Sequence, residues 1–379
     1  MIDFRYHLVS LIAVFLALAV GIVLGAGPLR DTIGDTLTGQ VQDLRADRER
    51  LRSELEAAEV NVTERTTYLE ASAPVLLEDV LTDQRVAIVT LPGTVGDDVE
   101  NLRDRLGQSG AEVVGEVAVT EAWTDPETES FRQTFAGQLL GYLDPAPADD
   151  AGTETIFGHA LGHALTDSEG EDALSSDAAT LLDLLTSAEA PLVTLTAEPS
   201  APADATVLVG PRPAEVPDEE ADPDEAEAAA RVLAAHVDLA EALAATGRGS
   251  VTVGSAVTDL DLVTALRADE TAAGTVTTVD SVSEITAAIS GPLAVAVAIS
   301  GSVNAYGFQT GAEEPVPPRV DISPEPVGPT EEETADGAET EPADGETSGA
   351  EPADGETAAD GGAAAAGEPA TGEQADGAA

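Results

Sequence analysis

The sequence contains no cysteine, no lysine and a single methionine, Met1, among its 379 residues. The lack of cysteine excludes disulfide bonds, thiolate metal sites and cysteine nucleophiles. Positive charge is also scarce, because 16 basic residues stand against 72 acidic ones and leave a formal net charge of −56. Such a surface repels phosphate, so the composition excludes a general nucleic-acid binder.

One long stretch lacks charge altogether. Residues 8–29 read LVSLIAVFLALAVGIVLGAGPL, and a helix of that length reaches about 33 Å, against roughly 30 Å of bilayer hydrocarbon. We therefore predict an N-terminal tip and membrane anchor over residues 1–29, crossing the membrane once. A cleaved signal peptide is the alternative, although its apolar region is usually only about 7–15 residues long.

The flanks of this anchor leave its orientation open, because Arg5 precedes the apolar run and Arg30 follows it. Within the run, Gly21 and Gly25 form a Gly-x-x-x-Gly pair on one helix face. Such a face allows two helices to approach closely in lipid, although glycine is common in membrane spans in any case.

Residues 30–75 have the pattern of a coiled-coil stalk. Apolar residues recur in steps of four and three, and acidic residues and arginine fill the positions between them. This 3.5-residue spacing favours a partner helix over a lone amphipathic helix lying on its own body. Arg48 and Arg65 interrupt the series and can fix its register. The predicted oligomerisation residues are Gly21, Gly25, Leu37, Val41, Leu44, Leu51, Leu55, Ala58, Val62 and Leu69.

The pattern changes after Pro74, where short β-rich runs alternate with helical segments. Residues 85–91, 97–106 and 111–119 read as strand, helix and strand, a unit that implies a parallel sheet. We predict a mostly parallel-sheet α/β domain over residues 76–310. Further strands are expected at 191–196, 205–210, 250–254 and 274–279, and helices at 131–143, 173–187, 224–246, 259–268 and 283–290. The apolar run 292–299 fits either a buried strand or a helix.

Four histidines are the main candidates for metal chemistry. His159 and His163 are four residues apart, and Asp167 follows after four more, so on a helix all three could face one Cu(II) or Zn ion. The competing interpretation is a helix weakened by Gly158 and Gly162 that carries two histidines without a metal. His236 is expected to be a partly buried neutral ring.

No catalytic motif stands out, and we predict a protein that is not an enzyme. Neither Gly-x-Ser-x-Gly nor His-Glu-x-x-His is present. The turn at 91–96 superficially resembles a nucleotide-binding loop but lacks its glycine pattern, and Pro92 removes a backbone N–H. Trp123 and Tyr306 are interpreted as packing residues. An enzyme with an unrecognised site is the remaining alternative.

Residues 311–379 contain 19 acidic residues and one arginine, and the heptapeptide EPADGET occurs at 341–347 and again at 351–357. Bulky apolar residues are almost missing, so this segment cannot form a core. We predict a disordered acidic C-terminal tail.

The N-terminal sequence resembles the actinobacterial MctB family of copper transport outer membrane proteins. The resemblance lies in the residues HLVSL at 7–11, FLALA at 15–19 and GIVLG at 21–25, and returns at Tyr306-Gly307 and Gly311-Ala312-Glu313. It implies copper homeostasis or export at the cell envelope, and a body on the extracytoplasmic side. Copper is the only cofactor or cargo it suggests. The chain departs from this chemistry in one respect, because cysteine and methionine are the soft copper ligands.

Together these features predict a membrane-anchored, oligomeric envelope protein. Its expected partners are the membrane, further copies of the chain through anchor and stalk, and envelope or division proteins, with no nucleic acid. The alternative is a scaffold in cell-envelope or cell-division complexes without copper chemistry. Normal copper tolerance in a deletion strain would separate the second hypothesis from the first.

Overall fold

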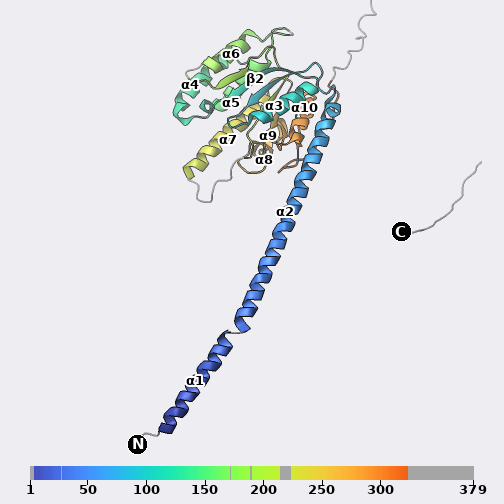
Figure 1. The fold of residues 1–379 in the computed structure, drawn as a ribbon. Helices are drawn as coiled ribbons and strands as arrows, with labels where there is room; N and C mark the ends of the chain where they lie inside the picture. The colour runs from blue at the N-terminus through green and yellow to red at the C-terminus, as the bar shows by residue number, and fades with distance from the viewer. Residues whose placement is uncertain (1–3, 27, 171, 188–189, 214–222, 323–379) are drawn as a thin grey trace, which may run out of the picture. The chain divides into compact units, whose positions relative to one another are not determined.

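The structure is a computed structural model that describes residues 4–26, 28–170, 172–187, 190–213 and 223–322 (Figure 1). Helix α1 runs from Phe4 to Ala26, and α2 from Pro28 to Leu77. The second helix thus begins at Pro28, and proline is readily tolerated at the first position of a helix. Within the described part of the chain, α1 is the one helix long and apolar enough to cross a membrane.

Helix α2 is 50 residues long, or about 75 Å, and passes through Pro74 without ending. Its last turns belong to the body of the protein. Ala73 and Leu77 are fully buried, Leu69 is half-buried, and all three pack in one apolar cluster with helix α10 (Ile285–Ile299). Their spacing of four residues places them on one face of the helix.

The body contains a seven-stranded sheet in the order β3-β2-β1-β4-β5-β6-β7. All neighbouring strands are parallel except β2 and β3. This arrangement confirms the predicted mostly parallel α/β domain. The strands are β1 (Arg85–Thr90), β2 (Glu112–Val119), β3 (Val193–Ala197), β4 (Ala205–Val209), β5 (Gly249–Val253), β6 (Thr277–Val279) and β7 (Ala305–Tyr306).

Helices cover both faces of the sheet. One apolar cluster joins the sheet to the end of α2, to α3 and to α10, and a second cluster joins it mainly to α4 through α9. In Figure 1, α3 and α10 lie side by side, and the two helices are in contact. The helices not yet bounded are α3 (Gly96–Gln108), α4 (Glu129–Leu139), α5 (Thr153–Thr166), α6 (Ser176–Ser187), α7 (Pro223–Ala244), α8 (Leu262–Ala268) and α9 (Glu270–Thr275).

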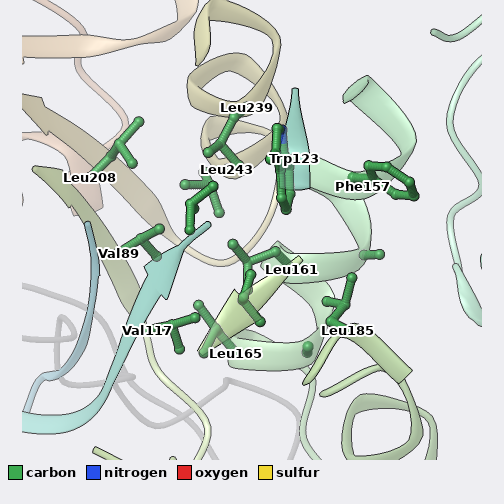
Figure 2. Packing of buried hydrophobic residues seen from close by; sticks show 14 of the residues in the cluster. Val89, Val117, Trp123, Phe157, Leu161, Leu165, Leu185, Leu208, Leu239 and Leu243 are labelled. Atoms are coloured by element: carbon green, nitrogen blue, oxygen red, sulfur yellow. The ribbon is translucent and has the colours of Figure 1, made fainter. Parts of the chain in front are cut away.

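The central strand β1 carries apolar side chains on both faces of the sheet, so both faces must be packed against helices. Val86 and Ile88 belong to one cluster, and Ala87 and Val89 to the other, because successive side chains of a strand point to opposite faces. Figure 2 shows Val89 among leucines of α5 and α7. Full burial of one such side chain stabilises the fold by about 1.5–3 kcal/mol.

Four features go beyond or differ from the sequence-based expectations. Residues 292–299, left open between strand and helix, form the second half of α10. The glycine-containing segment 153–166 is the helix α5, and β7 was not anticipated. The predicted end of the body at residue 310 falls short, because Val320 and Ile322 still pack against the core cluster. The rest of the predicted acidic tail, 323–379, lies outside the described residues.

Candidate functional site

The middle of α2 exposes the apolar series predicted to hold a partner helix. The exposed fractions are 60% for Leu37, 43% for Val41, 70% for Leu44, 58% for Leu51 and 60% for Leu55. Val62 is 60% exposed and Ala58 is exposed as well. Leu69 differs from the others, because it packs in part against the body of its own chain. The series that remains open to a partner therefore ends at Val62.

Side-chain contacts within α2 do little to hold this segment. Arg50 pairs with Asp47 at 3.1 Å and with Glu54 at 3.3 Å, and Arg52 pairs with Glu56 at 3.2 Å. These groups are all well exposed, and such pairs stabilise a helix by only about 0.2–0.5 kcal/mol each. A single helix without an apolar contact surface is marginal in water.

Gly21 and Gly25 lie on the exposed helix α1, one turn apart. A Cβ atom added at either glycine meets no other atom within 4 Å. None of the described residues therefore occupies the shallow face that the pair forms, and a second helix has access to it.

The predicted metal ligands lie on α5 and just beyond its end. His163 is buried, with Nδ1 at 3.1 Å from Asp167 Oδ1, but the two atoms do not have hydrogen-bond geometry. Burial, and then the charge of His163, lowers the pKa of the half-buried His159. Among the described residues, no three His, Cys, Asp or Glu side chains gather in a way that could hold a metal ion. A copper or zinc site at His159, His163 and Asp167 stays a prediction of the sequence.

The glycines between these histidines have a packing role. A Cβ atom on Gly158 would lie 2.6 Å from Cβ of Ala242, and one on Gly162 would overlap Thr246. Gly158 thus allows α5 to approach α7 closely, and Gly162 allows it to approach Thr246 just after α7. The expectation that they weaken this helix considered only their intrinsic propensity, and the close contact with α7 outweighs it.

A crevice of about 590 Å³ lies at the carboxyl edge of the sheet. Pro92 follows β1, Pro211 follows β4, and Leu260 to Leu262 come after β5, so the ends of three parallel strands converge on it. The first half of α7 forms the opposite wall. Of this crevice, the sequence analysis considered only the turn at 91–96, as a nucleotide-binding loop, and the residues of that turn do not suit a nucleotide.

The crevice lining includes an arginine that is paired with a carboxylate and a histidine that is buried. Arg212 donates from Nε and Nη2 to the two carboxylate oxygens of buried Asp98, at 2.9 and 3.0 Å. His236 is 9% exposed, and burial lowers its pKa from 6.5 to about 4. The imidazole is therefore neutral at physiological pH, as the sequence predicted.

A second cleft, of about 380 Å³, lies along the same helix and is more polar. Buried Arg132 donates from Nη1 to the carbonyl oxygen of Trp123 at 2.7 Å and to Glu154 Oε1 at 2.5 Å. Burial, and then the charge of Glu154, raises the pKa of the nearby Asp238. Nη1 of this arginine is satisfied inside its own chain, whereas its buried Nε has no hydrogen-bond partner among the described residues. We assign no ligand to this cleft.

The segment around Tyr306, which carries part of the family resemblance, is organised by a buried ion pair. Arg267 Nη1 lies 3.0 Å from Asp280 Oδ2, and the guanidinium also donates to the carbonyl oxygens of Tyr306 and Thr310. Asp280 accepts the backbone N–H groups of Phe308 and Gln309. Burial alone would raise the pKa of Asp280, but these hydrogen bonds hold it below its usual value.

The structure explains why glycine follows tyrosine in the Tyr306-Gly307 pair. Its φ is +131°, and a Cβ atom there would overlap the carboxylate of Asp280. Tyr306 is 1% exposed and Trp123 is fully buried, which confirms both as packing residues. Figure 2 shows Trp123 beside Phe157, with ring centroids 5.5 Å apart.

Comparison with known proteins matches residues 1–317 to the family described as "Copper transport outer membrane protein, MctB". Proteins named copper transporter MctB from Mycobacterium bovis and Mycobacterium tuberculosis (strain H37Rv) are each 30% identical over 141 residues, which cover 37% of this chain and 45% of theirs. The Mycobacterium leprae protein of that name is 31% identical over 141 residues, or 37% of this chain and 44% of its own. These alignments span less than half the length of the relatives.

Proposed function

This chain belongs to the copper transport outer membrane protein family MctB. From that membership we propose a role in copper homeostasis or export. The chain would act as a membrane-anchored, oligomeric component or accessory of the transport machinery. The family match over 1–317 supports the role, as do the relatives named copper transporters. Helix α1 supports attachment to a membrane of the cell envelope. The body would lie on the extracytoplasmic side.

The observation that carries the oligomeric part is the open apolar series on α2. Leu44, Leu51 and Leu55 keep between 58% and 70% of their surface exposed, on a stretch of α2 in which residues 40–65 are all exposed. A second copy of the chain offers the same stripe in the same register, and interdigitation of the two stripes removes both from water. The open face of Gly21 and Gly25 extends the proposed contact into the membrane.

Cysteine crosslinking tests this pairing directly, because the chain has no cysteine of its own. Leu51→Cys should form disulfide-linked pairs upon mild oxidation in membranes, since coiled-coil seam positions bring equivalent residues together. Val60→Cys is the matched control, because Val60 is 57% exposed, like Leu51 at 58%, but lies away from the seam. Equal crosslinking at both positions, or none at Leu51→Cys, would contradict the proposed pairing.

The copper role is tested in a deletion strain. We expect the strain to lose copper tolerance, the wild-type chain to restore it, and a chain with Leu55→Glu to restore it only partly if pairing matters for the role. Normal tolerance with a septation defect would instead support the alternative, a scaffold without copper chemistry. The absence of cysteine and the single methionine favour that alternative, since these are the soft copper ligands.

A direct copper contact has its own candidate. We propose that His159 and His163 on α5, with Asp167 just after it, bind Cu(II) only weakly. Their spacing and the 3.1 Å approach of His163 to Asp167 support an interaction, but the three side chains do not gather around one point. Calorimetry with the double variant His159→Ala and His163→Ala should show weaker Cu(II) binding than the wild type. His236→Ala serves as the control, because it removes a histidine outside the proposed site. An unchanged isotherm in the double variant would contradict the proposed site.

A further inference from the structure

The crevice between the strand ends and α7 has the position of a ligand site. From β1 the chain passes through α3 to β2 on one side, whereas β4 pairs with β1 on the other side. The order of strands therefore reverses at β1 and β4. Open α/β sheets bind ligands in the crevice outside the carboxyl ends of the strands at such a switch point.

The walls of the crevice are mostly apolar. Helix α7 contributes Ala229, Val232 and Leu233, and the loop after β5 contributes Leu260 and Leu262. A volume of about 590 Å³ lies within the roughly 300–1,000 Å³ of small-molecule sites, which combine apolar walls with a few polar groups. The walls therefore suit a hydrocarbon ring system or a short chain.

His236 is the polar group that points to a ligand. It lines the crevice, and its imidazole has no hydrogen-bond partner among the described residues, although it is 9% exposed. Its ring nitrogens are not among the fully buried polar atoms that lack a partner, so water in the crevice can reach them, and a ligand would have to replace that water. A neutral imidazole has one nitrogen that donates and one that accepts, and a bound head group with an N–H or O–H can satisfy the acceptor.

The charges around the crevice decide which head group fits. Arg212 is the one basic side chain in the lining, and the bidentate contact with Asp98 already neutralises it. The carboxylates of Glu121 and Glu225 also line the crevice and repel an anion. We propose that this crevice binds a small apolar molecule whose single head group is a neutral or cationic hydrogen-bond donor. This assignment goes beyond the copper role and does not depend on it.

The single tryptophan provides the measurement. Trp123 is buried beside the crevice, whose lining includes Glu121 and Thr124 on either side of it. Three probes share one apolar cage and differ in the head: 1-adamantanemethylamine, 1-adamantanemethanol and 1-adamantanecarboxylate. With the full chain in phosphatidylcholine nanodiscs, the amine and the alcohol should change Trp123 fluorescence saturably, and the carboxylate should bind about tenfold more weakly or worse.

Variants on α7 separate the crevice from the lipid. Ala229→Phe should fill the crevice and weaken binding of the amine at least about tenfold, whereas Ala230→Phe is the matched control, because Ala230 is also exposed but does not line the crevice. His236→Phe keeps a ring of similar size and should reduce binding of the amine and the alcohol. No saturable response in the wild type, equal binding by the Ala229 variant, or tightest binding of the carboxylate would each overturn the proposal.

Discussion

Leucines in the middle of α2 and leucines of the body lie in opposite environments. Leu44, Leu51 and Leu55 are each more than half exposed, whereas Leu102 and Leu106 on α3 are 2% and 0% exposed. The body thus buries its apolar surface within one chain, whereas the middle of α2 leaves its apolar surface exposed, which is the surface we propose for pairing. A change in the body should affect stability of each chain separately, and a change in the stalk should affect association.

The largest effect is expected from the buried ion pair of the body. Asp280→Ala should lower the free energy of unfolding by about 3–5 kcal/mol, because it leaves the guanidinium of Arg267 buried without its counter-charge. Urea unfolding followed by Trp123 fluorescence measures the loss. Glu100→Ala removes an exposed carboxylate from α3 and should stay within about 0.5 kcal/mol of the wild type. Similar stability of both variants would show that the pair contributes little.

The stalk should show the reverse behaviour. Leu55→Glu should weaken association by about 1.5–3 kcal/mol per copy, the free energy of burying a leucine, and leave urea unfolding of the body unchanged. Sedimentation in detergent micelles measures association. Val60→Glu, at an equally exposed position off the seam, should remain oligomeric. If both substitutions dissociate the protein to the same extent, the seam is not the contact.

Acid should destabilise the body through His236. Burial lowers the pKa of this histidine from 6.5 to about 4, so the folded state binds its proton more weakly than the unfolded state does. The contribution of His236 to stability is complete above pH 6.5 and falls as pH decreases toward 4, by about 2 kcal/mol at pH 5.

His236→Phe isolates this contribution. The difference in unfolding free energy between variant and wild type should shift in favour of the variant by about 2 kcal/mol from pH 7.5 to pH 5. Burial raises the pKa values of Asp238 and Glu241, but these groups titrate in both proteins and cancel in the difference. A pH-independent difference would mean that His236 titrates normally in the folded protein.

The smallest effect is expected where α5 meets α7. Gly158→Ala should destabilise the body by about 1–2 kcal/mol, because its Cβ would lie 2.6 Å from Cβ of Ala242. Gly137→Ala on α4 meets no atom within 4 Å and should be neutral or stabilise by up to about 1 kcal/mol. Opposite signs for two identical substitutions would confirm that helix contact, and not helix propensity, sets the need for glycine at 158.

Much of the body could be predicted because its patterns are local. The β-rich runs at 85–91 and 205–210 became the adjacent central strands β1 and β4. Residues 292–299 could not be assigned, because a buried helix is apolar on all sides and shows no period. The packing of this helix against α3 is visible only in the structure. Cδ1 of Leu102 lies 2.5 Å from the position that a Cβ atom on Gly291 would take.

The candidate sites were predicted less evenly. The seam of α2 follows from spacing alone, and the structure leaves it exposed up to Val62. The crevice joins Pro92, Pro211, His236 and Leu260, which are far apart in the sequence and carry no shared motif. Only the alternation of parallel strands could have pointed to the edge where they meet.

The sequence by itself determined the apolar N-terminal helix, the long helix that follows and the mostly parallel sheet, because each depends on the composition or periodicity of single segments. Tertiary structure alone decided that the last turns of α2 belong to the core, that Gly158 and Gly162 serve close packing, and that His236 faces a crevice without a partner. These features depend on which distant side chains come within a few ångströms of one another, and that information is not contained in the spacing of residues along the chain.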